Sequence, residues 1–147
     1  MRPYDLNVIA YDPFVSRDDA DELGITLCSL EEVFARADVV SLHAPWLPET
    51  EKMIRAEHFA AMKQGASFIN TARGAVVDEA GLAEVFARRK DLFAVLDVTW
   101  PEPPLPENPF FDLPNVIITP HIAAQPRFNA LDDLDDMIVS LARAIAP

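Results

Sequence analysis

The stretch that decides the fold spans residues 92–124 and reads LFAVLDVTWPEPPLPENPFFDLPNVIITPHIAA. It contains two apolar runs of strand length, at 92–98 and 115–119. Asp97 lies at the end of the first run, and Glu102 and His121 lie in the proline-containing loops that follow the two runs. Loops that follow the strands of α/β proteins carry many of their acid–base residues. The stretch therefore indicates a catalytic layout at one edge of a sheet.

The rest of the chain alternates between apolar runs and segments of helical period. Further strands are expected at 7–11, 25–28, 38–43 and 66–71. Helices are expected at 16–23, 30–37, 51–63, 78–90 and 128–145. Ser29 and Glu32 have the spacing of a capping box, and Gly24 and Gly65 are expected to end helices. The run at 38–43 has the continuous apolar character of a fully buried strand. Strands that alternate with helices in this way predict an α/β fold with a mostly parallel sheet.

The composition limits the class of protein. A chain of 147 residues, half of them hydrophobic, suffices for one domain, which is expected over residues 1–147. The net charge of −12 argues against binding to nucleic acid or to an anionic membrane. Cys28 is the single cysteine, so we expect no disulfide framework and a reducing compartment, by default the cytoplasm. The sequence shows no signal peptide and no apolar run long enough to span a membrane.

Asp12 directly follows the first expected strand. A dinucleotide-binding fold places a carboxylate there, where it accepts hydrogen bonds from the adenosine ribose. An acidic group at this point repels a 2′-phosphate, which favours NAD over NADP. The alternative is an aspartate that only stabilises the turn before Pro13.

Arg73 belongs to the sequence Asn70-Thr71-Ala72-Arg73-Gly74, which ends another expected strand. Gly74 is expected to let the backbone turn sharply. The guanidinium is a planar fork that suits a carboxylate. An arginine in such a turn can equally cap a neighbouring helix or pair with a surface acid.

Glu102 and His121 lie in two loops that a parallel sheet brings to one edge. A carboxylate beside a histidine fixes the tautomer of the ring and stabilises its charged form, which makes the pair a general acid–base device. Among the other histidines, His43 is interpreted as a residue at a strand end, and His58 as a solvated or partly buried residue of a helix. The spacing of histidines and carboxylates suggests no metal centre.

Four segments taken together resemble the D-isomer-specific 2-hydroxyacid dehydrogenases. They are DVVSLHAP (38–45) with PET (48–50), INTARG (69–74), LDV (96–98) with EP (102–103), and LPNV (113–116) followed by TPHI (119–122). Their order and spacing also match those of the family, and the resemblance extends from about residue 8 to residue 124. The family includes phosphoglycerate, glyoxylate/hydroxypyruvate, formate and D-lactate dehydrogenases.

The resemblance implies a Rossmann-type, doubly wound parallel sheet and the interconversion of a small 2-hydroxy acid and its 2-oxo acid with NAD. It implies that Arg73 holds the substrate, that His121 exchanges the proton of the C2 hydroxyl, and that Glu102 orients His121. Other residues would contact the cofactor. These are Asp12 at the adenosine ribose, Thr71, Ala72 and Arg73 along the nicotinamide half, Asp97 at the carboxamide, and His121, Ala123 and Ala124 closing the site.

The glycine-rich phosphate loop of the family is missing from the sequence. Gly-x-Gly-x-x-Gly should end roughly twenty residues before the ribose-binding acid, but eleven residues precede Asp12. The four glycines never stand two apart. We therefore expect an incomplete nucleotide-binding domain that lacks the first strand, the glycine-rich loop and the first helix, together with the separate substrate domain.

The missing strand would be the central one, between the strands that begin near residues 7 and 38. Two unpaired strand edges would favour association through the open edge of the sheet, so we expect the chain to repack, to take a strand or a second chain from elsewhere, or to be a fragment of a longer enzyme. The apolar face of the helix expected at 128–145 also favours a homodimer. Two alternatives to an enzyme in its own right therefore stay open. One is a non-catalytic remnant that acts as a dimerisation or regulatory module, and the other is one half of a split enzyme.

Overall fold

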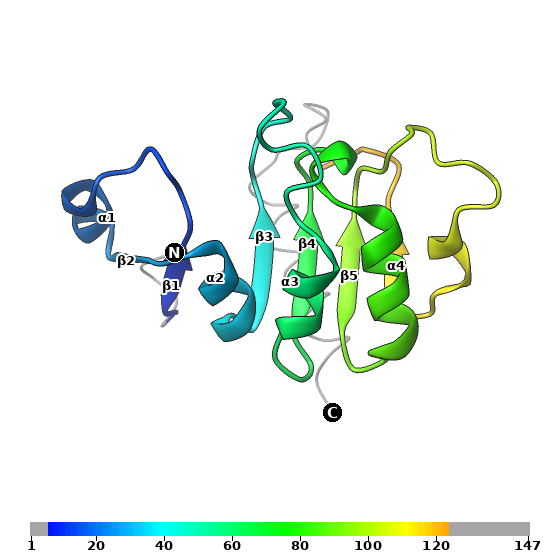
Figure 1. The fold of residues 1–147 in the computed structure, drawn as a ribbon, viewed down its shortest axis with the longest axis horizontal. Coiled ribbons are helices and arrows are strands. Elements are labelled where there is room, and N and C mark those ends of the chain that lie inside the picture. The colour runs from blue at the N-terminus through cyan, green and yellow to red at the C-terminus, as the bar shows by residue number, and fades with distance from the viewer. Residues whose placement is uncertain (1–5, 124–147) are drawn as a thin grey trace.

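The expected alternation of strands and helices is present in the structure, a computed structural model that describes residues 6–123 (Figure 1). The strands are β1 (Val8–Ala10), β2 (Ile25–Leu27), β3 (Val39–Leu42), β4 (Ser67–Asn70), β5 (Phe93–Leu96) and β6 (Val116–Ile118). The α-helices are α1 (Arg17–Leu23), α2 (Leu30–Arg36), α3 (Ala56–Ala61) and α4 (Glu79–Arg88). Two 3₁₀ turns are η1 (Gly74–Val76) and η2 (Pro109–Asp112). The helix predicted at 128–145 lies outside the described residues.

The predicted helix ends of the N-terminal part are confirmed. The Ser29 hydroxyl accepts a hydrogen bond from the Glu32 N–H at 3.2 Å, and the Glu32 carboxylate accepts one from the Ser29 N–H at 2.9 Å. This reciprocal capping box begins α2. Gly24 ends α1 in the left-handed conformation, with φ of 72°. Local sequence therefore determines where α1 ends and where α2 begins, on either side of β2.

The strand pairs of the described residues are all parallel and form two sheets. The strands β3, β4, β5 and β6 lie side by side in chain order, and β1 pairs with β2 in a second sheet. In the larger sheet Ser67 of β4 is the register partner of Val39 in β3 and of Phe93 in β5. Strand pairing stops at β1 and at β3, in agreement with the expectation that these two strands are not neighbours. The predicted parallel α/β fold is confirmed.

The core lies between the larger sheet and helices α2, α3 and α4, which cover one of its faces (Figure 1). Phe59 of α3 stands at its centre and is fully buried. Its ring meets Phe34, Phe68 and Phe86 edge-on, with centroids 5.8, 5.0 and 5.9 Å away. These edge-to-face contacts fix how the three helices sit on the sheet.

The prediction of a fully buried strand at 38–43 is wrong. Burial alternates along β3: Val40 and Leu42 are buried, whereas Val39 is 56% exposed. Phe93 of β5 and Ile117 of β6 are likewise exposed. Within the described residues, helices cover only the opposite face of this sheet (Figure 1). Burial therefore follows the two-residue period of a strand that is covered on one side.

The helix predicted at 51–63 is much shorter than expected. Lys52 has a φ of 49° in the left-handed region, and Ile54 forms a parallel β-bridge with Val77. The Asp78 N–H then donates to the Ile54 carbonyl at 2.8 Å. An extended residue that pairs with a distant segment cannot continue a helix, so α3 starts at Ala56. The helical period of this segment could not reveal a pairing across more than twenty residues.

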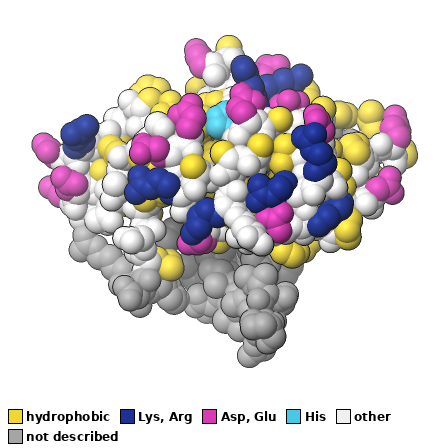
Figure 2. Space-filling model, turned by 60° about the horizontal axis from the view of Figure 1, so that its bottom comes forward, with side chains coloured by type: hydrophobic (Ala, Val, Ile, Leu, Met, Phe, Trp, Pro, Cys, Tyr) yellow, Lys and Arg dark blue, Asp and Glu magenta, His cyan; other side chains and the backbone are white. Residues whose placement is uncertain are grey.

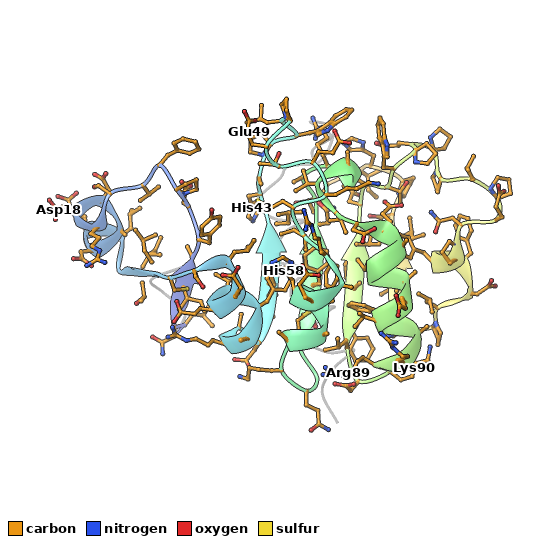
Figure 3. The ribbon with its side chains drawn as sticks, viewed as in Figure 1. Asp18, His43, Glu49, His58, Arg89 and Lys90 are labelled. Atoms are coloured by element: carbon orange, nitrogen blue, oxygen red, sulfur yellow. The ribbon has the colours of Figure 1, made fainter. Side chains whose placement is uncertain are left out.

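Arg89, directly after α4, joins the ends of several elements. Its guanidinium donates to the Ala60 and Met62 carbonyls at 3.2 and 3.3 Å and to both carboxylate oxygens of Asp91, at 2.9 and 2.7 Å. These bonds from Arg89 hold the pKa of Asp91 well below its usual range. Arg89 and Lys90 lie at the opposite end of the molecule from His43 (Figure 3). The bonds of Arg89 therefore stabilise the end of the sheet remote from the predicted site.

The surface in Figure 2 carries lysine and arginine side chains interspersed with aspartate and glutamate rather than gathered in one basic patch. Across residues 6–123, no helix combines the length and the apolar character needed to cross a lipid bilayer.

We expect the change Phe59→Ala to lower the free energy of unfolding by about 3–5 kcal/mol, because it leaves a cavity between three helices. Urea unfolding of the purified chain measures this loss. The matched control is Phe14→Ala, at a side chain that is 92% exposed, which should change stability little. Equal effects of the two changes would contradict the packing at Phe59.

We expect Asp91→Asn to make stability less dependent on pH in acid. The pKa of Asp91 is lower in the folded than in the unfolded chain, so its ionised form stabilises the fold above the unfolded value of about 4. That stabilisation is lost as the pH falls toward the lower folded value. The difference in unfolding free energy between the native chain and Asp91→Asn should therefore shrink between about pH 6 and about pH 2. A difference that is constant with pH would contradict the ion pair.

Candidate active site

The residues predicted to carry chemistry follow β4, β5 and β6, which are adjacent parallel strands. Thr71–Gly74 follow β4, Asp97 follows β5, and Thr119–His121 follow β6. Because the carboxyl ends of parallel strands meet at one edge, these segments converge there. In Figure 1 the loops after β3, β4 and β5 all leave the upper edge of the larger sheet.

The structure joins Glu102 and His121, as the sequence predicts. His121 Nδ1 lies 2.6 Å from Glu102 Oε1, and the two side chains are 39% and 37% exposed. An ionised carboxylate only accepts hydrogen bonds, so Nδ1 carries the proton of the ring and donates a hydrogen bond to Glu102. This leaves Nε2 of the neutral ring with a free lone pair. The pair therefore has the geometry of a general base that is still open to solvent.

Asp97 holds the loop that carries His121. Asp97 is 3% exposed, and its carboxylate accepts hydrogen bonds from the Ile122 N–H at 3.0 Å and the Ala123 N–H at 2.9 Å. It also accepts a hydrogen bond from the Thr119 hydroxyl. These bonds bracket His121, whose φ of 53° is unusual for a residue with a side chain and costs about 1–2 kcal/mol. The contact of Asp97 with nicotinamide stays a prediction, and its role as an anchor was not expected.

The turn that carries Arg73 is fixed by Asn70, which is buried at the end of β4. Its amide oxygen accepts from the Ala72 N–H at 3.0 Å, and its amide nitrogen donates to the Arg73 carbonyl at 3.1 Å. The Arg73 side chain is exposed, and its guanidinium donates to the Ala72 carbonyl at 2.6 Å. None of the carboxylates in residues 6–123 pairs with it. The remaining donors of the guanidinium are therefore directed to solvent.

Gly74 is required for a reason other than the expected sharp turn. Its φ is not positive, but a Cβ atom built on it would lie 2.2 Å from the carbonyl carbon of Thr99. Real side chains do not approach a backbone so closely, so glycine alone fits. The loop of Arg73 thus packs directly on the loop that leads to Glu102. Sequence reasoning missed this contact because Thr99 lies 25 residues away.

Asp12 follows β1 and is exposed, and its Oδ1 accepts a hydrogen bond from the Phe14 N–H at 2.8 Å. This bond is that of a turn aspartate, and the ribose contact stays a prediction. Ala123 is exposed at the end of the His121 loop, and Ala124 lies outside the described residues.

The two other histidines have distinct surroundings (Figure 3). His43 is exposed just after β3, with Nε2 2.9 Å from the Ser41 hydroxyl. His58 is buried in α3, where its Nδ1 accepts from the Arg55 N–H at 3.0 Å and its ring packs on Phe34. The placement of His58 in a helix is confirmed, but the residue is buried and packed on Phe34 rather than solvated or partly buried. Among residues 6–123 no group of three or more histidine, cysteine or acidic side chains is placed to hold a metal ion.

Comparison with known proteins gives matches along most of the chain. A family model described as the NAD binding domain of D-isomer specific 2-hydroxyacid dehydrogenases matches residues 1–123. D-3-phosphoglycerate dehydrogenase of Archaeoglobus fulgidus is 45% identical over 123 residues, which are 84% of this chain and 23% of that protein. The enzyme of the same name from Methanocaldococcus jannaschii is 40% identical, over 84% of this chain and 24% of that protein. The chain thus spans about a quarter of the length of these relatives.

Solved structures also resemble the chain in sequence and in fold. The TT0316 protein from Thermus thermophilus is 45% identical with a TM-score of 0.69, over 79% of this chain and 35% of that one. D-lactate dehydrogenase with NAD+ from Lactobacillus jensenii is 33% identical with a TM-score of 0.70, over 95% of this chain and 44% of that one.

We expect Asp97→Ala to release the loop around His121. The N–H groups of Ile122 and Ala123 lose their acceptor, so their amide hydrogen exchange should accelerate at least about fivefold, the equivalent of roughly 1 kcal/mol per bond. Exchange followed by NMR measures this directly. Asp112→Ala, at an exposed acid of η2, is the control and should leave both amides unchanged. Unchanged exchange in Asp97→Ala would show that the loop is held by something else.

Proposed function

The chain belongs to the D-isomer specific 2-hydroxyacid dehydrogenase family, as its motifs predict, and we propose that it supplies the acid–base half of an NAD-dependent oxidoreductase. The substrate would be a small D-2-hydroxy acid or the corresponding 2-oxo acid. The observation that supports this most directly is the 2.6 Å contact between His121 Nδ1 and Glu102 Oε1. Because the chain spans about a quarter of its curated relatives, the activity of a whole dehydrogenase is part of the proposal.

His121 would act as the general base in oxidation. Its Nε2 would take the proton of the C2 hydroxyl, and the Glu102 carboxylate would stabilise the imidazolium that forms. In the reverse direction the same nitrogen would return the proton to the carbonyl oxygen. A neutral ring with its proton on Nδ1 is the tautomer that this transfer needs, and a carboxylate beside Nδ1 favours it.

Arg73 would hold the substrate. Its guanidinium is exposed at the edge where His121 lies and is unpaired with any carboxylate of residues 6–123. A planar fork of N–H donors would bind the carboxylate of the hydroxy acid and orient C2. The contact between Gly74 and Thr99 would keep this fork at a fixed distance from the loop of Glu102.

NAD is the cofactor that the family model names. When bound, it would accept the hydride from C2 of the hydroxy acid. The residues after the strands suit two parts of it: the exposed carboxylate of Asp12 could accept hydrogen bonds from ribose hydroxyls, and Thr71, Ala72 and Arg73 lie at the carboxyl edge of β4 for the nicotinamide half. The sequence has no pair of glycines two apart to cradle the pyrophosphate. The remaining residues thus fit the ends of the cofactor better than its centre.

A second candidate is a non-catalytic dimerisation or regulatory module. It is favoured by β1 and β3, each of which pairs on one side only within the described residues. Exposed apolar side chains on the same sheet, such as Val39, also favour association. In the split-enzyme alternative this chain both associates and takes part in catalysis, because another chain completes the sheet and the substrate site.

Cys28 is a free thiol, which suits a reducing, cytoplasmic setting.

NADH titration separates these candidates. For the dehydrogenase, we expect millimolar NADH to shift the NMR signals of the Thr71, Ala72 and Arg73 amides, and NADPH to act more weakly because Asp12 repels the 2′-phosphate. Asp12→Ser should reduce this preference by at least about fivefold, whereas Asp18→Ser on α1 should not. No shift at millimolar NADH would favour the dimerisation module. Recovery of 2-oxo acid reduction only on co-expression with a chain that supplies the phosphate loop and substrate domain would favour the split enzyme.

For a preparation that oxidises NADH with hydroxypyruvate or pyruvate, we expect His121→Gln to lower kcat by at least about 100-fold, the usual contribution of a general acid. NADH-induced shifts at Thr71 should persist. Glu102→Gln should also lower kcat, and the same change at Glu107, an exposed residue of the same loop, is its control. Full activity of His121→Gln would refute the assignment.

A further inference from the structure

Glu79, the first residue of α4, reaches across to the loop that carries Glu102. Its Oε1 accepts a hydrogen bond from the backbone N–H of Trp100 at 2.7 Å. Trp100 is two residues before Glu102 in the sequence and 21 residues after Glu79. The proposed reaction gives Glu79 no role, and its side chain is not among those expected at the substrate.

Trp100 and Thr99 are held from three directions. Thr99 packs on Gly74 after β4, where no side chain would fit. The Trp100 ring lies on the Trp46 ring, in the loop after β3, with centroids 4.7 Å apart. These two contacts are non-directional packing, whereas the carboxylate of Glu79 gives a directed hydrogen bond to this backbone.

The carboxylate of Glu79 lies in a partly dry setting. Two shallow hollows flank it, and Ala80 and Trp100 line both. The charged groups in the first hollow are Glu51 and Lys52 from the loop after β3 and Asp78 beside Glu79, whereas the second hollow is lined otherwise by uncharged residues of 101–110. Burial raises the pKa of Glu79 to about 7, against the opposing effect of the Trp100 N–H. The Glu79 carboxylate, which accepts the hydrogen bond from Trp100, therefore changes charge near neutral pH.

From this geometry we propose that Glu79 is a positioning residue that fixes the backbone at Trp100 and thereby holds Glu102 against His121. The inference rests on the proposed acid–base role of that pair. A hydrogen bond weakens steeply when its atoms separate by more than a few tenths of an ångström. Glu102 and His121 come from different loops and are both partly exposed, so their contact depends on how firmly each loop is held. Asp97 holds the loop of His121, and Glu79 would do the same for the loop of Glu102.

NMR of the intact chain tests the hydrogen bond itself. The Trp100 amide signal should shift with pH with a midpoint at about 7. This shift should persist in His121→Gln, which excludes His121 as its source, and should vanish in Glu79→Gln. A Trp100 amide that does not respond to pH in this range, or that responds equally in Glu79→Gln, would overturn the assignment.

The ring ¹⁵N shifts of His121 test the consequence at the pair. At a pH where the ring is neutral, they report which nitrogen carries the proton. Glu79→Ala should shift the tautomer ratio away from Nδ1–H by about fivefold, equivalent to roughly 1 kcal/mol of lost hydrogen bonding. Glu79→Gln keeps an acceptor oxygen and should retain most of the native ratio. Glu84→Ala, which removes an exposed acid of the same helix, is the matched control.

The outcomes distinguish this inference from the proposed function. Glu102→Ala, which removes the acceptor of the Nδ1–H, should abolish the native tautomer preference whatever Glu79 does. A native preference that survives in Glu79→Ala but not in Glu102→Ala would overturn the role of Glu79 alone. A native chain without the preference would overturn both assignments. If Glu79→Ala does not fold, a native ratio in Glu79→Gln together with loss of its Trp100 titration still supports the inference, and an altered ratio there overturns it.

Discussion

The buried carboxylate of Asp97 is the group on which the candidate site depends. It ends β5, and it gathers three donors from the segment after β6, so it ties two neighbouring strands together beyond the last pair of their ladder. A buried carboxylate is costly unless its oxygens are hydrogen-bonded, and here the partners are supplied by the loop that must be ordered. The cost of burying the charge and the unfavourable φ of His121 are therefore offset by the same set of bonds.

The sequence predicted those features of the fold that depend on interactions between residues close together in the chain. The capping box of Ser29 and the left-handed Gly24 were found from residues a few positions apart, and parallel topology was enough to predict that the loops of Glu102 and His121 meet at one edge. The features that the sequence did not predict depend on contacts between segments that lie far apart in the chain. The bridge from Ile54 to Val77 shortens α3, the approach of Thr99 dictates Gly74, and Glu79 contacts Trp100 across 21 residues. A single sequence carries no periodic or motif signal for such pairings.

The residues proposed to act on the substrate are supported by buried polar side chains. The residues suited to proton transfer and to holding a carboxylate are present at one edge of the larger sheet, and their supports, Asn70 and Asp97, are buried and hydrogen-bonded. The glycine-rich cradle for a pyrophosphate is not encoded in the sequence, and the described strands form two sheets instead of one. The proposed proton transfer at His121 and the proposed binding of NAD can therefore be measured separately.

The contacting, mutually tilted rings of Trp46 and Trp100 give this site a built-in optical reporter. They are the two tryptophans of the chain, they come from different loops at the edge of the sheet, and both are about half exposed. Indole emission of the unlabelled protein thus comes from these two rings alone. An event that parts the two loops changes the surroundings of both rings and therefore changes this emission.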